Sequence, residues 1–168
     1  MAKRAAQQRR FVVHEHKATR LHYDFRLEIG GALKSWAIPK GPSMNPADKR
    51  LAVMVTDHPL EYADFEGVIP EGHYGAGPVV IWDHGYTVPE DEDPPEQQLA
   101  ADRIVFTLHG RKLRGGFALA RFKGGHGARW LLIKRKDEEA DSTWRLRTEL
   151  ARTKLGTLSV KIPPCESA

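Results

Sequence analysis

The chain has 168 residues, of which 40% are hydrophobic and 29% are charged, a composition typical of one globular domain with a buried core. Its net charge of +4 suits a polyanionic partner without requiring one. The single cysteine excludes an intramolecular disulfide and fits a reducing cytosol, and no apolar run approaches the length of a membrane span.

Residues 1–10 are rich in basic side chains and glutamine and lead into no apolar segment, so a mobile basic arm is expected rather than a secretory signal. Ordered structure is expected to begin at Phe11. Residues 21–29 then alternate, with apolar side chains at odd positions and polar ones at even positions: His22, Asp24, Arg26 and Glu28. This period of two predicts a β-strand whose polar face carries an imidazole, a carboxylate and a guanidinium.

Downstream, short apolar segments separated by glycines and charges predict further strands over 33–38, 51–56, 79–82, 86–88, 103–108, 116–122 and 130–135. The segments 79–82 and 86–88 are expected to form a hairpin. Many short strands with glycine turns and no sustained helical period predict a mainly β fold with little helix. We expect a closed or nearly closed β-barrel over residues 11–138, with a crater-like active site.

Two segments fall outside this strand pattern. Residues 89–98 are acidic and proline-rich, which predicts an exposed excursion or a tolerated insertion. Residues 139–168 are expected to form a basic C-terminal tail, either with an amphipathic helix over 143–155 or disordered.

His22 and Asp24 would leave the same face of one strand, about 6.5–7 Å apart at Cα, so both side chains can close onto one ion. His16 can add a second imidazole from the preceding bend, although His14 competes with it for this place. This nitrogen and oxygen set suits Mn, Fe or Zn better than Mg or Ca. Two histidines and an aspartate close together are also often plain polar surface.

Arg26 extends the same face, where a guanidinium beside a metal ion can clamp phosphate oxygens through two hydrogen bonds. The competing interpretation is a surface arginine paired with Glu28. Lys40 and Arg50 flank a proline-bounded loop and can add positive charge for an anion, although each alone is typical of solvated surface.

His58 follows the strand predicted over 51–56, where a histidine can act as a general acid or donate to phosphate. Tyr62 can donate to the same anion or pack in the core. His73 and Tyr74 lie in the glycine-rich loop 67–77, whose backbone can approach a ligand closely. This loop contains neither of the glycine fingerprints for binding mononucleotides or dinucleotides.

Several of these segments together resemble the 3′-phosphoesterase domain family of bacterial DNA ligase D, over roughly residues 11–138. The matching motifs are residues 16–28, 33–42, 57–62, 65–77 and 130–134. Because no polymerase or ligase segment is present, the chain resembles a stand-alone member or an excised domain. The resemblance implies a manganese-dependent site in a β-barrel, with Co²⁺ or Zn²⁺ as other possible ions.

The resemblance also implies a function, in which a 3′-terminal ribonucleoside and then the resulting 3′-phosphate are removed from DNA primer ends during double-strand break repair by non-homologous end joining. It implies His16, His22 and Asp24 as metal ligands, Arg26 and His58 as contacts to the scissile phosphate, and Tyr62 as an auxiliary donor. Lys40 and Arg50 are further candidates for phosphate binding.

The expected partners are DNA or RNA/DNA 3′ ends, with DNA ligase D or end-binding repair proteins. The expected state is a monomer, cytoplasmic and associated with the nucleoid, with no membrane contact. Thr56 stands where some relatives carry an acidic residue, and only residues 1–10 precede the expected barrel. Cleavage of the ribonucleoside phosphodiester is therefore the firmer expectation, and removal of a bare 3′-phosphate the weaker one.

Two other classes of protein fit parts of the pattern. A non-catalytic nucleic-acid-binding barrel would use Trp36, Trp82 or Tyr74 as stacking surfaces, and its DNA binding would be insensitive to a chelator. A non-haem iron oxygenase would combine His22 and Asp24 with a distant His109 or His126. The oxygenase alternative explains neither Arg26 nor the run of long motifs.

Overall fold

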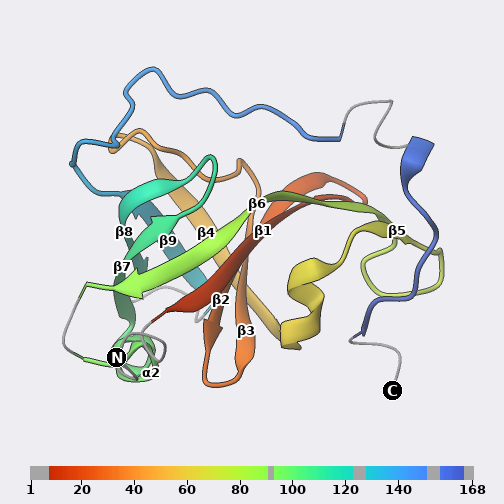
Figure 1. Cartoon of the computed structure of the whole chain (residues 1–168), viewed down its shortest axis with the longest axis horizontal. Helices are drawn as coiled ribbons and strands as arrows, with labels where there is room; N and C mark the ends of the chain where they lie inside the picture. Colours follow the sequence, from red (N-terminus) through yellow and green to blue (C-terminus); the bar gives the residue numbers. More distant parts are fainter. Residues whose placement is uncertain (1–7, 91–92, 123–127, 151–155, 165–168) are drawn as a thin grey trace.

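The computed structural model describes residues 8–90, 93–122, 128–150 and 156–164. Eight strands close into an antiparallel barrel in the order β1-β2-β3-β4-β9-β8-β7-β6, and β6 pairs back to β1 (Figure 1). A further short strand, β5, adds to β6. The strands are β1 (Arg9–Lys17), β2 (Leu21–Ile29), β3 (Ala32–Ile38), β4 (Lys49–His58), β5 (Gly67–Ile69), β6 (Gly77–Pro89), β7 (Arg103–His109), β8 (Arg114–Arg121) and β9 (Arg129–Lys134).

The helical content is small, as the sequence predicts. A 3-10 helix, η1 (Leu60–Asp64), follows β4, and one short α-helix, α2 (Pro95–Ala100), lies between β6 and β7. The mainly β barrel is therefore confirmed. Within the described ranges, neither helix has the length and apolar character needed to cross a membrane.

Alternation along β2 divides the protein into an interior and an outer layer. Its odd-numbered side chains, including Phe25 and Leu27, join the large apolar cluster that all eight barrel strands enclose. The even-numbered side chains point to the outer face of the barrel wall. There η1 and β5 cover the wall with a second, smaller cluster, made of Val12, Leu33, Tyr62, Ala63, Phe65, Ile69 and Val79. The polar face of β2 is thus partly covered by η1 and β5 and is not fully exposed to solvent.

The hairpin expected between 79–82 and 86–88 is wrong, because both segments belong to the single 13-residue strand β6. Gly85, which lies between the two segments, permits a close approach between strands. A Cβ atom at this position would lie 2.0 Å from the carbonyl oxygen of His109. The long strand pairs in succession with β5, β1 and β7, and so closes the barrel.

The ends of the predicted segments also shift. Arg9 and Arg10, which the sequence analysis assigned to the basic arm, are the first residues of β1. Of the rest of that arm, the structure describes only Gln8. In the acidic segment 89–98, residues 91–92 lie outside the described part. The remainder includes the start of α2, where buried Gln98 accepts a hydrogen bond from the backbone N–H of Val105.

The C-terminal segment wraps around the barrel. Residues 143–150 are not helical, and Trp144 and Leu146 pack against the barrel core. The indole of Trp144 donates to the carbonyl of Pro42 over 3.2 Å, and the indole of Trp82 donates to the carbonyl of Arg147 over 2.7 Å. In Figure 1 this segment crosses the barrel and then descends beside β5.

Two backbone contacts fix the last described residues beside β5. The N–H of Val68 donates to the carbonyl of Ser159 over 2.8 Å, and the N–H of Lys161 donates to the carbonyl of Val68 over 3.0 Å. Residues 151–155, where the amphipathic helix was expected to end, lie outside the described part of the chain.

A buried carboxylate on β1 anchors this segment. Glu15 accepts hydrogen bonds from the hydroxyl of Thr148 and from the backbone N–H groups of Glu149 and Leu150. Glu15→Gln is expected to lower the free energy of unfolding by about 1–3 kcal/mol, because an amide N–H₂ cannot accept from the groups that face it. Urea unfolding followed by circular dichroism measures the change. Glu138→Gln, at an exposed position, is the control, and an equal loss in both variants would contradict the anchor.

Candidate metal and phosphate site

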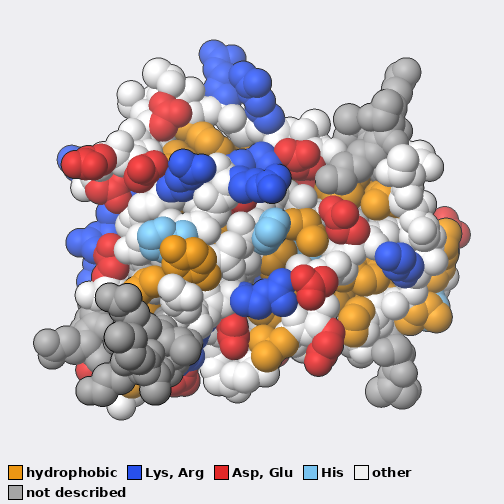
Figure 2. All heavy atoms as spheres, viewed as in Figure 1, with side chains coloured by type: hydrophobic (Ala, Val, Ile, Leu, Met, Phe, Trp, Pro, Cys, Tyr) orange, Lys and Arg blue, Asp and Glu red, His pale blue; other side chains and the backbone are white. Residues whose placement is uncertain are grey.

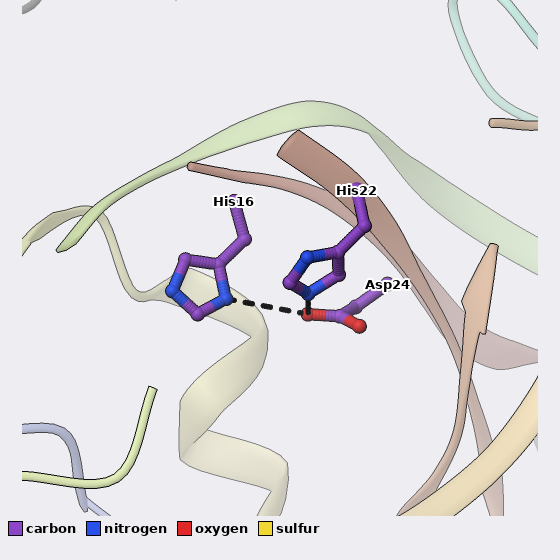
Figure 3. A group of neighbouring side chains, drawn as sticks. All are labelled: His16, His22 and Asp24. Carbon is purple, nitrogen blue, oxygen red and sulfur yellow. Dashed lines mark ion pairs between the residues drawn. The ribbon is translucent and has the colours of Figure 1, made fainter. Parts of the chain in front are cut away.

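Three candidate ligands meet on two adjacent strands. His16 on β1 lies directly opposite His22 on β2 in the strand register, so it extends from a strand rather than from the expected bend. The Nδ1 atom of His16 lies 3.8 Å from Oδ2 of Asp24, and the Nε2 atom of His22 lies 3.3 Å from the same oxygen (Figure 3). One ligand atom from each side chain falls within 4.8 Å of the others, which is close enough to hold one ion.

The second nitrogen of each ring is held by a backbone carbonyl. His16 Nε2 lies 2.6 Å from the carbonyl oxygen of Gly75, and His22 Nδ1 lies 3.1 Å from that of Arg20. Because a carbonyl oxygen only accepts, these two nitrogens carry the protons and donate. The other nitrogens, His16 Nδ1 and His22 Nε2, face Asp24: in a protonated ring this nitrogen donates to the carboxylate, and in a neutral ring its lone pair is available to a metal ion beside Asp24.

The charge of Asp24 follows from its neighbours. Burial opposes ionisation, but hydrogen bonds from His16 and His22 and the charge of Arg26 together hold the pKa of this carboxyl well below its usual range. The hydrogen bond to Asp24 outweighs partial burial at His22 and raises the pKa of that imidazole. The group therefore contains a carboxylate that stays ionised and attracts positive charge, as a cation site requires.

His14, the alternative third ligand, has a different role. It is fully buried, its Nδ1 accepts from Nε of Arg26 over 3.1 Å, and its Nε2 donates to the carbonyl of Phe65 over 3.1 Å. Burial, reinforced by the charge of Arg26, places the pKa of His14 well below its ordinary value. Both ring nitrogens are occupied, so His14 orients the arginine and is not part of the ligand group.

Arg26 is almost completely buried at the base of the site. Besides His14, its guanidinium contacts Oγ of Ser35 at 2.9 Å, Nδ1 of His58 at 3.2 Å and Oδ2 of Asp24 at 3.2 Å. The surface pair with Glu28 is not formed, since Glu28 accepts from the backbone N–H of Arg10 instead. The arginine thus joins the ligand group to the neighbouring residues of the pocket.

His58 and Tyr62 stand beside this guanidinium. Arg26 lies 4.8 Å from the centre of the Tyr62 ring, and the rings of His58 and Tyr62 are 4.7 Å apart. Burial, followed by the charge of Arg26, lowers the pKa of His58 to about 4. The imidazole is therefore neutral near pH 7, which favours a role as a hydrogen-bonding group over the role of general acid.

The pocket in front of these side chains has a volume of about 300 Å³. Lys40 and Arg50 do not line it: Lys40 is exposed after β3, and Arg50 lies 3.6 Å from Asp48. The other predicted site residues all line the pocket, and so does Tyr74; they are His16, His22, Asp24, Arg26, His58 and Tyr62. The full lining is His16, Ala18, His22, Asp24, Arg26, Ala37, Val55, Thr56, His58, Tyr62, Ile69, Tyr74, Gly75 and Pro163.

Sequence reasoning missed Ser35 and Pro163. Ser35 alternates with Leu33 and Ala37 on the outer face of β3, so a polar residue on an otherwise apolar face was an available signal. Pro163 reaches the pocket through the backbone contacts of its segment with β5, and nothing in the sequence pattern indicates this.

The oxygenase alternative loses its third ligand among the described residues. The ring of His109 stacks on Tyr86 at 4.5 Å and lines no part of the pocket, while His126 lies outside the described residues. Basic side chains on the face in Figure 2 are interspersed with acidic ones, so this face does not present a continuous basic surface.

Together, the fold and the site define a β-barrel protein whose outer wall carries a pocket lined by two histidines, an aspartate and a buried arginine. Residues 14–121 match the model of a family described as the DNA Ligase D 3′-phosphoesterase domain. The chain belongs to this family.

Three curated proteins illustrate the similarity. The chain is 55% identical over 134 residues to the multifunctional non-homologous end joining protein LigD of Pseudomonas aeruginosa, a match covering 79% of this chain and 16% of that protein. It is 46% identical over 136 residues to the LigD of Mycolicibacterium smegmatis, covering 77% and 17%. It is 46% identical over 130 residues to the multifunctional non-homologous end joining DNA repair protein LigD of Mycobacterium tuberculosis, covering 77% and 16%. The chain thus spans only a small share of each relative.

Proposed function

We propose that this protein is a metal-dependent 3′-end-processing phosphoesterase that removes a terminal ribonucleoside from DNA primer ends in non-homologous end joining. The observation that carries the proposal is the group of His16, His22 and Asp24 joined through Asp24 to buried Arg26. Family membership and the names of the relatives support a substrate at DNA ends.

The donor set fits a transition metal. Two imidazole nitrogens and one carboxylate oxygen suit Mn²⁺, with Co²⁺ or Zn²⁺ as alternatives, better than ions that prefer oxygen shells. When bound, such an ion supplies Lewis-acid polarisation of a phosphoryl oxygen. The protein fixes both imidazoles through the carbonyls of Gly75 and Arg20 before any ion arrives.

Arg26 and His58 provide the phosphate contacts in this proposal. A guanidinium has five N–H groups, and four contacts to described residues engage Nε, Nη1 and one hydrogen of Nη2. The second Nη2 hydrogen remains to donate to a phosphoryl oxygen as negative charge grows there. His58 lines the same pocket as the second proposed phosphate contact, with its Nδ1 3.2 Å from the guanidinium and 3.0 Å from the carbonyl oxygen of Thr56, and Tyr62 holds the guanidinium by a cation–π contact.

The ribonucleoside step is the main proposed activity: water attacks the phosphorus of the last phosphodiester, the P–O5′ bond breaks, and the terminal ribonucleoside leaves with its O5′ protonated while the primer keeps a 3′-phosphate. Removal of the remaining 3′-phosphate is the secondary one, since Thr56 lines the pocket where some relatives carry an acid. We also propose that the protein acts as a monomer on DNA or RNA/DNA 3′ ends in the nucleoid region of the cytoplasm, beside DNA ligase D or end-binding repair proteins.

The direct test is a gel assay on a labelled primer–template that ends in one ribonucleotide, with and without Mn²⁺. The wild type is expected to shorten the primer only with metal, while His22→Ala and His58→Ala lose most of this activity. His109→Ala, far from the pocket, is the matched control and should retain it. Absence of shortening by the wild type, together with chelator-insensitive DNA binding, would favour the non-catalytic barrel.

The protonation state of His58 gives a separate prediction. Because its pKa in the folded protein is lowered to about 4, the Hε1 resonance of His58 is expected to stay constant from pH 8 to 5.5. The unfolded chain binds this proton more readily, so the His58 contribution to stability is lost as pH falls from about 6.5 toward 4. NMR of the metal-free protein, with the resonance assigned by its absence in His58→Gln, measures the titration. A midpoint near 6.5 would restore the general-acid hypothesis.

A further inference from the structure

The lining of the pocket contains two kinds of residue. The candidate ligands, Arg26 and His58 are charged or strongly polar, whereas Ala18, Ile69, Tyr74 and Pro163 carry no charge. A nucleoside phosphate has the same division, with a charged phosphate at one end and a flat, weakly polar base at the other. The phosphate contacts alone therefore leave the less polar part of the pocket unexplained.

Tyr74 is the aromatic residue among these uncharged lining residues, and it is 82% exposed. Tyr23 and Tyr62, in contrast, are each 3% exposed, and Tyr86 is 40% exposed and stacked on His109. Trp36 and Trp82, which the sequence suggested as stacking surfaces, are buried in the barrel interior. Among these aromatic side chains, Tyr74 therefore combines a place in the pocket lining with high exposure to solvent.

The loop that carries Tyr74 is fixed to the candidate metal ligands. The carbonyl of Gly75, the next residue, accepts from Nε2 of His16 over 2.6 Å. Gly77 has a φ of 123°, and a Cβ atom there would lie 2.3 Å from the carbonyl oxygen of Lys17, so the loop lies directly against the end of β1. Backbone contacts thus hold residue 74 next to the candidate ligand His16.

We propose that Tyr74 is a specificity-determining residue whose ring stacks on the base of the 3′-terminal nucleoside while Arg26 and His58 contact its phosphate. This proposal rests on the proposed function, because it assumes a nucleotide in the pocket. Stacking on an aromatic ring tolerates every base, since each base has a π-face. The protein should therefore accept all four terminal bases while discriminating against a terminus that lacks one.

The test compares two primers, one ending in a ribonucleotide and one ending in an abasic ribose, across Tyr74→Phe, Tyr74→Ala and the wild type. We expect the wild type to have a kcat/KM about tenfold or more higher on the base-bearing primer, in line with the strength of base–aromatic stacking. Tyr74→Ala should lose most of this preference, mainly through KM, whereas Tyr74→Phe should keep it. Tyr86→Ala, which removes an aromatic ring outside the pocket, should behave as the wild type.

A binding measurement separates this proposal from the proposed function. A non-cleavable primer ending in 2-aminopurine should lose fluorescence on binding to the wild type and to Tyr74→Phe, but much less on binding to Tyr74→Ala. An unchanged ratio between the two primers in Tyr74→Ala, or equal quenching by all variants, would overturn the stacking role while leaving the phosphoesterase intact. Quenching that depends on Tyr74 without any cleavage would instead reject the proposed function and retain the stacking site.

Discussion

Arg26→Met is expected to reduce kcat/KM for removal of a terminal ribonucleoside by about 10²–10³, the usual effect of losing a preorganised donor to developing negative charge. The substitution removes the proposed phosphate donor and also the four contacts that hold His14, Ser35, His58 and Asp24 around the guanidinium. Arg26→Lys keeps the charge but not the planar fork of donors, so its activity should lie between those of Arg26→Met and the wild type.

Measurements of stability and of metal binding show whether Arg26→Met loses activity because a phosphate donor is missing or because the site is disrupted. Breaking the buried contact with Asp24 is expected to lower the free energy of unfolding by about 3 kcal/mol, the low end for a buried ion pair, because His16 and His22 still contact the carboxylate. Arg10→Met is the matched control, since Arg10 pairs with Asp64 on the surface, where such pairs contribute less than about 1 kcal/mol. Steady-state kinetics measures kcat/KM, urea unfolding measures the free energy of unfolding, and calorimetric titration measures the affinity for Mn²⁺. Near-normal activity in folded Arg26→Met would remove Arg26 from the mechanism.

Phe25→Ala is expected to have the largest effect on stability, about 3–5 kcal/mol, as is usual when a buried phenylalanine is truncated. Phe25 is fully buried in the barrel, with its ring 6.3 Å from that of Phe11 and 6.0 Å from that of Phe106. It also lies between Asp24 and Arg26 on β2. A cavity behind the strand should therefore disturb both site residues, although Phe25 touches neither the ion nor the substrate.

The size of the cavity should set the size of the effect. Phe25→Leu fills most of the space and should lower the free energy of unfolding by about 1–1.5 kcal/mol. Phe122→Ala is the control: this position is 42% exposed, so the free energy of unfolding should change by less than about 0.5 kcal/mol. Urea unfolding measures all three variants, and Mn²⁺ affinity of the folded fraction reports on β2. Equal losses in Phe25→Ala and Phe122→Ala would mean that the barrel interior does not hold the strand in place.

The sequence predicts the parts of this structure that depend on local alternation. The pattern of residues 21–29 predicts β2, its apolar face and the shared face of the candidate ligands His22 and Asp24, because side-chain direction in a strand depends only on position. The same logic fails at Gly85, since a glycine at a turn and a glycine at a close strand contact look alike in sequence. Only the neighbouring strand distinguishes them.

Long-range contacts explain the other differences. His14 and His16 share one face of β1, and alternation alone does not decide which of them is the ligand. The decision comes from distant residues, because the carbonyl of Phe65 engages His14 and the carbonyl of Gly75 orients His16. Likewise, Lys40 and Arg50 have the right charge and flank a proline-bounded loop but do not line the pocket, whereas Pro163 lines it from near the C-terminal end of the chain.

The local origin of the ligand group has a consequence for the order of folding. His16, His22 and Asp24 all come from the hairpin of β1 and β2, whereas closing the barrel requires β1 to find β6 much later in the chain. Hairpins form within about 1–10 μs, while pairing of distant strands is far slower because a long loop must first be ordered. The candidate ligands and Arg26 can therefore come together before His58, on β4, joins the pocket. Any ion binding by the hairpin would then precede completion of the pocket.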